Sequence, residues 1–322
     1  MDVNKIREDF PILSRKMNDK PLVYLDNGAT TLKPQCVIDA VCNYYTYLGA
    51  NAHRGDYQMS AQVDEAFENA RITAQKFINA KYKEEIAFTS GSTMGLNEIA
   101  IMLTQQVLKS NDVVLTCESE HASNILPWQQ VGIAKNIQVE YIELDHEGKV
   151  TIEAVQNAIH DGVKIIALAH VSNVLGFEAP IEEICKLAHE KGIIVVVDGA
   201  QSTPHIDIDV QKLDCDFFVF SAHKLCGPTG VGVMYGKKKW MDMLEPVFFG
   251  GESNARFNKC GDLILKESPL KFESGTQPIE GVIGMAAAMD YLKKIGKDNI
   301  HAHEVKRVFL GTSQRFRQSN HI

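Results

Sequence analysis

The chain of 322 residues lacks long apolar runs and an excess of positive charge. No run approaches the roughly 20 apolar residues that a membrane-spanning helix requires, so we expect no membrane partner. Asp and Glu outnumber Lys and Arg by 41 to 33, for a net charge of −8, which argues against nucleic acid as a partner. Residues 1–9 are too charged for a secretory signal peptide, so we expect none.

Closely spaced cysteines are also missing, although the chain has seven cysteines in all. None forms the Cys-x-x-Cys pair that is typical of a zinc site, so no metal is expected. An odd number of scattered cysteines indicates reduced thiols, and we therefore expect a cytoplasmic protein.

Short apolar runs alternate with helical patterns along the chain, without internal repeats. Runs rich in β-branched and aromatic residues are typical of buried parallel strands. Strands are predicted at 85–89, 112–116, 139–142, 164–169, 193–197, 217–220 and 230–236. Helices are predicted at 96–108, 152–159, 181–191 and 281–294. This alternation predicts an α/β fold, with a mostly parallel sheet and helices on both faces.

Polar side chains follow two of the predicted strands directly. They lie in the segments Asp198-Gly-Ala-Gln201 and Ser221-Ala-His223-Lys224. Ligands of open α/β sheets bind at the carboxyl ends of strands, so these side chains are expected at one rim. The set suits pyridoxal phosphate (PLP), which needs a lysine for covalent attachment and an acid to keep its pyridine nitrogen protonated.

Each of these side chains has a predicted role and a plainer alternative. Lys224 is predicted to hold the cofactor and to move protons at the substrate Cα. Asp198 suits a helix N-cap, and we also predict that it pairs with the pyridine nitrogen, because an unpaired buried carboxylate is costly. Helix N-termini bind phosphate, and segment 90–93 joins a predicted strand to a helix. The predicted phosphate ligands are Ser92, Thr93, Ser221 and His223.

Eight segments occur in an order that resembles the class V aminotransferase family of PLP enzymes, and in it the cysteine desulfurase and selenocysteine lyase branch. They are 24–30, 51–55, 89–93, 120–121, 170–173, 198–201, 221–224 and 274–277. Segment 6–13 resembles the start of group II desulfurases. The resemblance implies the type I PLP-dependent transferase fold. It implies a large PLP-binding domain at 21–290, and a small domain made of 1–20 and an incomplete 291–322.

The resemblance also implies roles for four further residues. Gln201 would donate a hydrogen bond to the phenolic oxygen of PLP. His121 would stack on the cofactor ring and serve as an acid or base. Asn173 would bond to the cofactor or the substrate carboxylate, although asparagine is also a common turn residue. Thr276 would reach the phosphate of the partner subunit in a homodimer. The segment of His53 and Arg54 would lie near the entrance of the substrate site or at the surface.

The activity implied is cysteine desulfuration, in which L-cysteine becomes L-alanine and the sulfur passes on as a persulfide. The branch also accepts L-selenocysteine, and a sulfur-acceptor protein serves iron–sulfur cluster assembly. Another class V activity, as an aminotransferase or a kynureninase-like lyase, remains open. The third hypothesis is that the chain is an inactive, truncated PLP-binding product.

The resemblance fades toward the end of the chain. In the family, the nucleophilic cysteine and a carboxylate-binding arginine lie well beyond the PLP lysine, and no such loop is found here. Cys226 is a weak candidate for the nucleophile and Cys260 a weaker one. Segment 309–322 resembles nothing in the family. We therefore expect a truncated chain with impaired turnover, and exposed apolar surface on the helix at 283–292.

Overall fold

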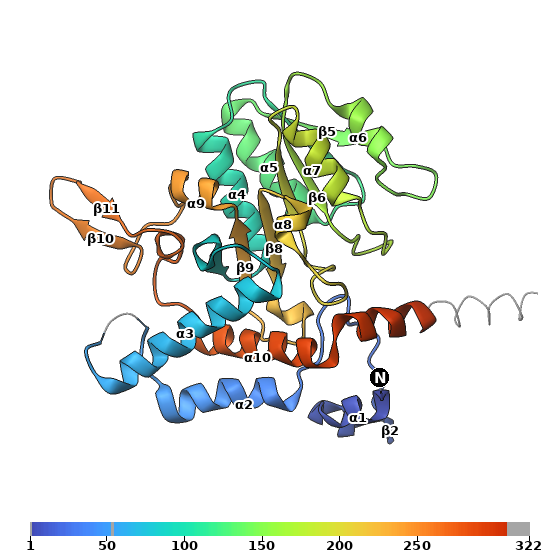
Figure 1. Cartoon of the computed structure of the whole chain (residues 1–322), viewed down its shortest axis with the longest axis vertical. Coiled ribbons are helices and arrows are strands. Elements are labelled where there is room, and N and C mark those ends of the chain that lie inside the picture. Colours follow the sequence, from blue (N-terminus) through green and yellow to red (C-terminus); the bar gives the residue numbers. More distant parts are fainter. Residues whose placement is uncertain (1, 53–54, 308–322) are drawn as a thin grey trace, which may run out of the picture.

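A seven-stranded sheet forms the centre of the computed structural model, which describes residues 2–52 and 55–307 (Figure 1). Its strand order is β3-β9-β8-β7-β6-β4-β5. The strands are β3 (Ile86–Thr89), β4 (Val113–Cys117), β5 (Gln138–Ile142), β6 (Val163–Ala169), β7 (Ile194–Asp198), β8 (Phe217–Ser221) and β9 (Gly232–Gly236). Strand β9 is antiparallel to β3 and β8, and the other pairs are parallel. All seven predicted strands and the mostly parallel sheet are confirmed.

The sheet separates two apolar cores, because side chains alternate between its faces. In β8, Phe217 and Val219 pack into one core, and Phe218 and Phe220 pack into the other. The first core includes residues of α4 (Ser92–Gln106) and α5 (Ala122–Lys135). The second includes residues of α3 (Gln58–Phe77), α6 (Ile152–Ala158), α7 (Ile181–His189), α8 (Val210–Leu213) and α10 (Ile279–Ile295). The prediction of helices on both faces is therefore confirmed.

Helix α4 begins four residues before the predicted start at 96. Gly91 has a φ of +140°, which lets the chain turn sharply from β3 into the helix. The Ser92 N–H then donates to Oγ of Ser221 on β8 (2.7 Å). A contact to a residue far along the chain thus sets the start of this helix. At α6, by contrast, Thr151 is a local N-cap whose Oγ1 accepts from the Ala154 N–H (3.1 Å).

Helix α10 is covered, so the predicted exposed apolar surface at 283–292 is wrong. Its residues Val282, Met285 and Met289 are fully buried. Helices α2 (Gln35–Asn43) and α3 lie beside it (Figure 1). Sequence analysis predicted neither of these two helices and therefore missed the cover. Exposed apolar side chains occur elsewhere, for example at Leu25, which is 90% exposed.

The remaining elements are short. The β10–β11 hairpin, which the sequence analysis did not predict, projects from the body of the molecule (Figure 1). None of the helices in the described ranges is both long and apolar enough to cross a membrane. The short elements are α1 (Val3–Glu8), α9 (Lys238–Met243), η1 (Pro11–Ser14), η2 (Tyr44–Leu48), η3 (Lys83–Glu85), η4 (Ala222–Lys224), η5 (Leu270–Phe272), β1 (Lys16–Met17), β2 (Lys20–Pro21), β10 (Asn254–Phe257) and β11 (Leu263–Leu265).

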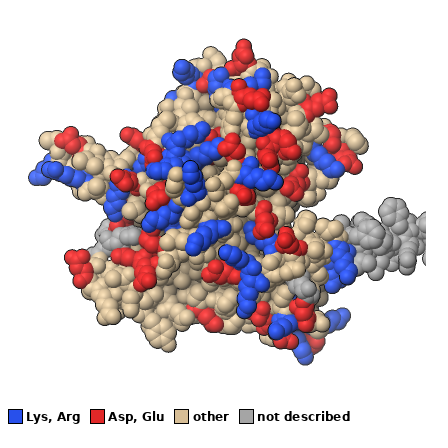
Figure 2. Space-filling view, viewed as in Figure 1, with Lys and Arg blue, Asp and Glu red and all other residues tan. Residues whose placement is uncertain are grey.

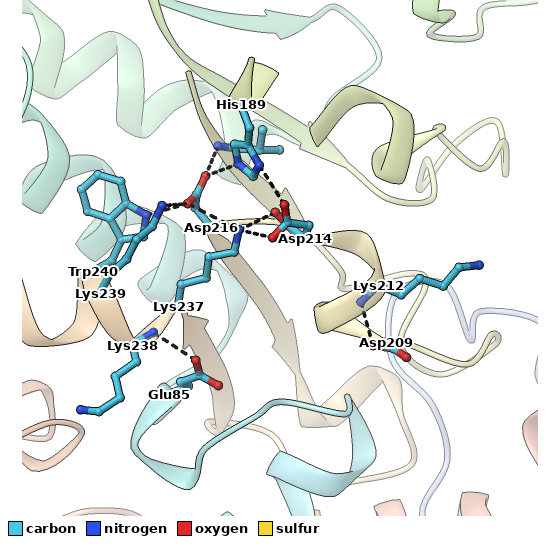
Figure 3. Close-up of polar contacts among 11 residues, drawn as sticks. Glu85, His189, Asp209, Lys212, Asp214, Asp216, Lys237, Lys238, Lys239 and Trp240 are labelled. Atoms are coloured by element: carbon cyan, nitrogen blue, oxygen red, sulfur yellow. Dashed lines mark hydrogen bonds and ion pairs between the residues drawn. The ribbon is translucent and has the colours of Figure 1, made fainter. Parts of the chain in front are cut away.

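A polar network lies at the amino end of β8 (Figure 3). The buried Asp216 carboxylate accepts from Nε1 of Trp240 (2.7 Å) and from the Val195 N–H (3.0 Å). Nε2 of His189 lies 2.9 Å from Asp216, and Nζ of Lys239 lies 3.1 Å from it. The network joins β7, β8, α7 and α9 at the edge opposite Ser221. Elsewhere, acidic and basic side chains are interspersed over the face shown in Figure 2.

Candidate active site

A cavity of about 540 Å³ opens at the rim that the sequence predicted. Nine of the ten predicted site residues line it: Ser92, Thr93, His121, Asn173, Asp198, Gln201, Ser221, His223 and Lys224. They follow five strands of the sheet, from β3 to β8, at the strands' carboxyl ends. The parallel sheet therefore brings together side chains that are up to 132 positions apart in the sequence.

Asp198 and Lys224 form the electrostatic centre of the cavity. Burial raises the pKa of Asp198, although its bond from the Ala200 N–H (2.9 Å) and the charges of Lys224 and His121 oppose this. Burial lowers the pKa of Lys224, and the charge of Asp198 opposes that shift. Burial therefore favours the neutral form of both groups. A cation next to Asp198 would restore its charge, and a neutral amine at Lys224 is a nucleophile.

The start of α4 forms a polar end of the cavity. Oγ of Ser221 lies 2.7 Å from both the N–H and the Oγ of Ser92. Oγ1 of Thr93 lies 2.8 Å from Oγ of Ser123. The first N–H groups of a helix have no partner within the helix, and its dipole favours anions there. Hydroxyls and a helix N-terminus together suit a phosphate group.

His121 and Gln201 are both held by backbone groups. His121 is the N-cap of α5, and its Nδ1 accepts from the Ser123 N–H (3.2 Å). Nε2 of Gln201 donates to the Gly28 carbonyl (3.1 Å). The segment 25–29 that includes Gly28 contributes four residues to the cavity lining. Sequence analysis found this segment through the family resemblance but assigned it no part in the site.

The backbone between Asp198 and Gln201 passes close to β8. A Cβ on Gly199 would lie 2.0 Å from Cζ of Phe218, so only glycine fits there without displacing that ring. The Gly199 N–H also donates to the Val219 carbonyl (2.8 Å). The close packing at Gly199 therefore sets the position of the backbone that carries Asp198 at the edge of the cavity. Sequence analysis did not single it out, because no local pattern reveals a neighbour from another strand.

Thr31 and Lys33 hold the turn that carries Lys224. The His223 carbonyl accepts from the N–H and Oγ1 of Thr31 (2.9 Å each) and from Nζ of Lys33 (3.2 Å). Oγ1 of Thr31 also accepts from the Cys226 N–H (2.8 Å). Burial and the charges of Lys224 and Lys33 lower the pKa of His223. These two supporting residues were missed, since nothing in their local sequence points to a contact about 190 positions away.

Some candidates lie outside the cavity. Thr276 is exposed and does not line it, so its expected role across a dimer stays a prediction. His53, Arg54 and segment 309–322 lie outside the described residues. Cys226 lines a neighbouring apolar groove, and Cys260 is exposed. Among the described residues, no cysteine lines the cavity.

The donors in the cavity fit PLP on their chemistry. Hydroxyl groups at a helix N-terminus suit its phosphate, the buried carboxylate of Asp198 suits a protonated ring nitrogen, and Lys224 supplies an amine. An amide at Gln201 and an imidazole at His121 lie in the same cavity.

The seven-stranded sheet and this rim define the type I fold of PLP-dependent transferases. The family model described as aminotransferase class-V matches residues 23–314. A probable cysteine desulfurase of Halalkalibacterium halodurans is 46% identical over 304 residues, which are 94% of this chain and 75% of the relative. The chain belongs to the class V aminotransferase family, in its cysteine desulfurase branch.

Solved structures agree with this assignment. The apo structure of a cysteine desulfurase from Thermococcus onnurineus NA1 has a TM-score of 0.90 and 37% identity, over 97% of this chain and 76% of that one. A cysteine desulfurase from Escherichia coli has a TM-score of 0.85 and 32% identity, over 93% of this chain and 73% of that one. The chain thus spans about three quarters of the length of these relatives.

Proposed function

We propose that the chain binds PLP in the cavity and acts on L-cysteine as a cysteine desulfurase. The convergence of nine predicted residues from five strands in one cavity carries this proposal. The organisation proposed is a large PLP-binding domain at 21–290, with 1–20 and 291–322 belonging to a small domain. L-selenocysteine is a second proposed substrate, because selenium and sulfur differ little in size and chemistry.

When bound, PLP supplies an aldehyde that reacts with amines and a ring that withdraws electrons from the substrate Cα. Lys224 would hold the aldehyde carbon through its amine and would move a proton at the substrate Cα. Asp198 keeps a proton on the ring nitrogen, which maintains the electron withdrawal. The lowered pKa of Lys224 favours its neutral, reactive form.

The other cavity residues bind and orient. Ser92, Thr93, Ser221 and His223 hold the phosphate, with the start of α4. Gln201 would donate to the phenolic oxygen, and His121 would stack on the ring and exchange protons with the reacting group. Asn173 bonds to the cofactor or the substrate carboxylate.

A homodimer completes the proposed site, with Thr276 bonding to the phosphate in the partner subunit. Its exposed position supports this proposal, because a side chain that serves another subunit lies at the surface of its own. A sulfur-acceptor protein is the proposed partner in solution.

Sulfur transfer needs a thiol, and no cysteine lines the described cavity. In the overall reaction, an acceptor thiol R–SH and L-cysteine give the persulfide R–S–SH and L-alanine. We therefore propose that the chain transfers sulfur poorly unless another thiol reaches the cavity. The same observation favours a second candidate, an aminotransferase or a kynureninase-like lyase, because neither reaction uses an enzyme thiol.

Product analysis separates these candidates. The PLP-loaded protein is incubated with L-cysteine and a small thiol, with L-kynurenine, or with an amino acid and a keto acid. Equal amounts of alanine and thiol-bound sulfur from L-cysteine support the desulfurase. Anthranilate from L-kynurenine, or transfer of the amino group to the keto acid, would instead support the second candidate.

A further inference from the structure

Glu120 precedes His121 in the chain without lining the cavity, and its carboxyl group contacts three elements. Its Oε1 accepts from the Ala169 N–H (2.7 Å) at the end of β6. Its Oε2 accepts from Nδ2 of Asn124 (2.7 Å) in the first turn of α5. Sγ of Cys117, the last residue of β4, lies 3.5 Å from Oε1. The Glu120 side chain therefore links the ends of β4 and β6 to α5, the helix that follows β4.

These elements lie next to residues of the candidate active site, either along the chain or across the sheet. The His121 carbonyl accepts from the Asn124 N–H (2.8 Å), and His121 itself caps α5. One residue beyond Ala169, the His170 N–H donates to the Asp198 carbonyl (2.9 Å). The contacts of Glu120 thus lead to His121 on one side and to Asp198 on the other.

The contact to Asn124 is sensitive to substitution, because Asn124 is fully buried. Within the described residues, Oδ1 of Asn124 has no hydrogen-bond partner, so the bond to Glu120 is the one that orients this amide. The pKa of Glu120 is raised to about 7, because burial outweighs the bonds from the Ala169 N–H and the Asn124 amide, which lower it. An enclosed carboxyl whose two oxygens both accept from N–H donors suits a fixed support.

We propose that Glu120 is a positioning residue, which fixes the His121 imidazole and the strand ends that carry Asp198 and Asn173. Glu120 does not line the cavity and acts through these neighbours. The inference rests on the proposed function, since the position of His121 matters only against a bound cofactor. Supports of this kind hold reactive groups in their productive geometry.

The test compares three variants. Glu120→Ala removes both acceptors. Glu120→Gln keeps the shape, and the Asn124 amide can turn so that its Oδ1 accepts from the new NH₂ group. Glu118→Ala is the matched control, because Glu118 is an exposed acid two residues earlier in the same turn.

Circular dichroism in the visible band of bound PLP is the main readout, because it reports the asymmetric surroundings of the ring. We expect Glu120→Ala to lose about half or more of the signal per bound cofactor and about tenfold in PLP affinity, as for losses of supporting contacts at other sites. Glu120→Gln and Glu118→Ala should keep the wild-type signal. A wild-type signal in Glu120→Gln would show that the loss in Glu120→Ala comes from the missing hydrogen bonds that position His121, and not from a general loss of stability.

Wild-type protein without a visible band would overturn the proposed function, and this inference with it. A wild-type band together with an unchanged signal in Glu120→Ala would overturn the inference alone. In cofactor-free protein, the NMR signals of the His121 ring should shift in Glu120→Ala and not in Glu118→Ala. If Glu120→Ala does not fold, Asn124→Ala breaks the same contact from the other side, and an unchanged signal there would equally contradict the inference.

Discussion

Arg71 and Glu273 form a buried bidentate ion pair, with Nη1–Oε1 at 2.6 Å and Nη2–Oε2 at 2.9 Å. Arg71 lies on α3, and Glu273 precedes α10. The pair also bonds to β3, since Arg71 donates to the Ile86 carbonyl (2.8 Å) and Glu273 accepts from the Phe88 N–H (2.7 Å). It therefore anchors the segment that carries Thr276.

Arg71→Ala should lower the free energy of unfolding by about 3–5 kcal/mol, because it leaves the Glu273 carboxylate buried without its partner. Urea unfolding followed by tryptophan fluorescence measures the change. Lys149→Ala is the control, because the pair of Lys149 with Glu147 is exposed and should contribute little to stability. Equal losses in both variants would contradict the assignment of a buried pair.

The fold should become less stable as the pH decreases, because Asp216 in its polar network is then protonated (Figure 3). Burial raises the pKa of Asp216, but bonds from Trp240, the Val195 N–H and His189, with the charge of Lys237, outweigh it and lower the pKa below 3.8. A depressed folded-state pKa stabilises the fold above the unfolded pKa of about 3.9, and this contribution is lost as pH falls below that value.

Asp216→Asn removes this titration, so its unfolding free energy should depend less on pH between about 5 and 3 than that of the wild type. Denaturant unfolding at a series of pH values gives both slopes. Asp290→Asn is the control, since Asp290 is an exposed carboxylate on α10. The account of the network fails if Asp216→Asn keeps the wild-type slope.

Gly199→Ala should reduce PLP binding, because its Cβ would force the Phe218 ring or the Asp198 backbone to move. Overpacking of this kind costs about 1–3 kcal/mol. Gly250→Ala is the control, since a Cβ there would meet only Cβ of Ser274 at 3.8 Å, an ordinary contact, and Gly250 does not line the cavity. Thermal unfolding and PLP titration of both variants measure the effect. Wild-type behaviour of Gly199→Ala would show that the close contact with Phe218 does not exist.

Cys226→Ala should leave sulfur transfer unchanged, because Cys226 lines the neighbouring groove and burial raises the pKa of its thiol. A raised pKa keeps the thiol protonated and weakly nucleophilic. Alanine formation from L-cysteine, with and without a small added thiol, is the measurement. The rate should depend on the added thiol in wild type and variant alike. A strong loss in Cys226→Ala would make Cys226 the nucleophile.

The sequence predicted the sheet well because its strands are buried on both faces, as in the run Phe217–Phe220. It predicted that the candidate site residues gather at one rim, because parallel strands end at the same edge of a sheet, so Asp198 and Lys224 had to lie close together. Prediction from the sequence failed where contacts between residues far apart in the chain determine where a helix begins or whether it is buried. Helix α4 begins early because Ser221 bonds to Ser92. Helix α10 is buried because α2 and α3, whose patterns were not read as helices, cover it.

The visible absorption spectrum after addition of PLP tests the central claim most directly. We predict a band of lysine-bound cofactor in wild type that is lost in Lys224→Ala and in Lys224→Arg. Because burial lowers the pKa of Lys224, attachment should proceed at a lower pH than for an exposed lysine. Lys212→Ala should keep the band, since Lys212 is exposed and does not line the cavity. A band that survives in Lys224→Ala, or none in folded wild-type protein, would contradict the account.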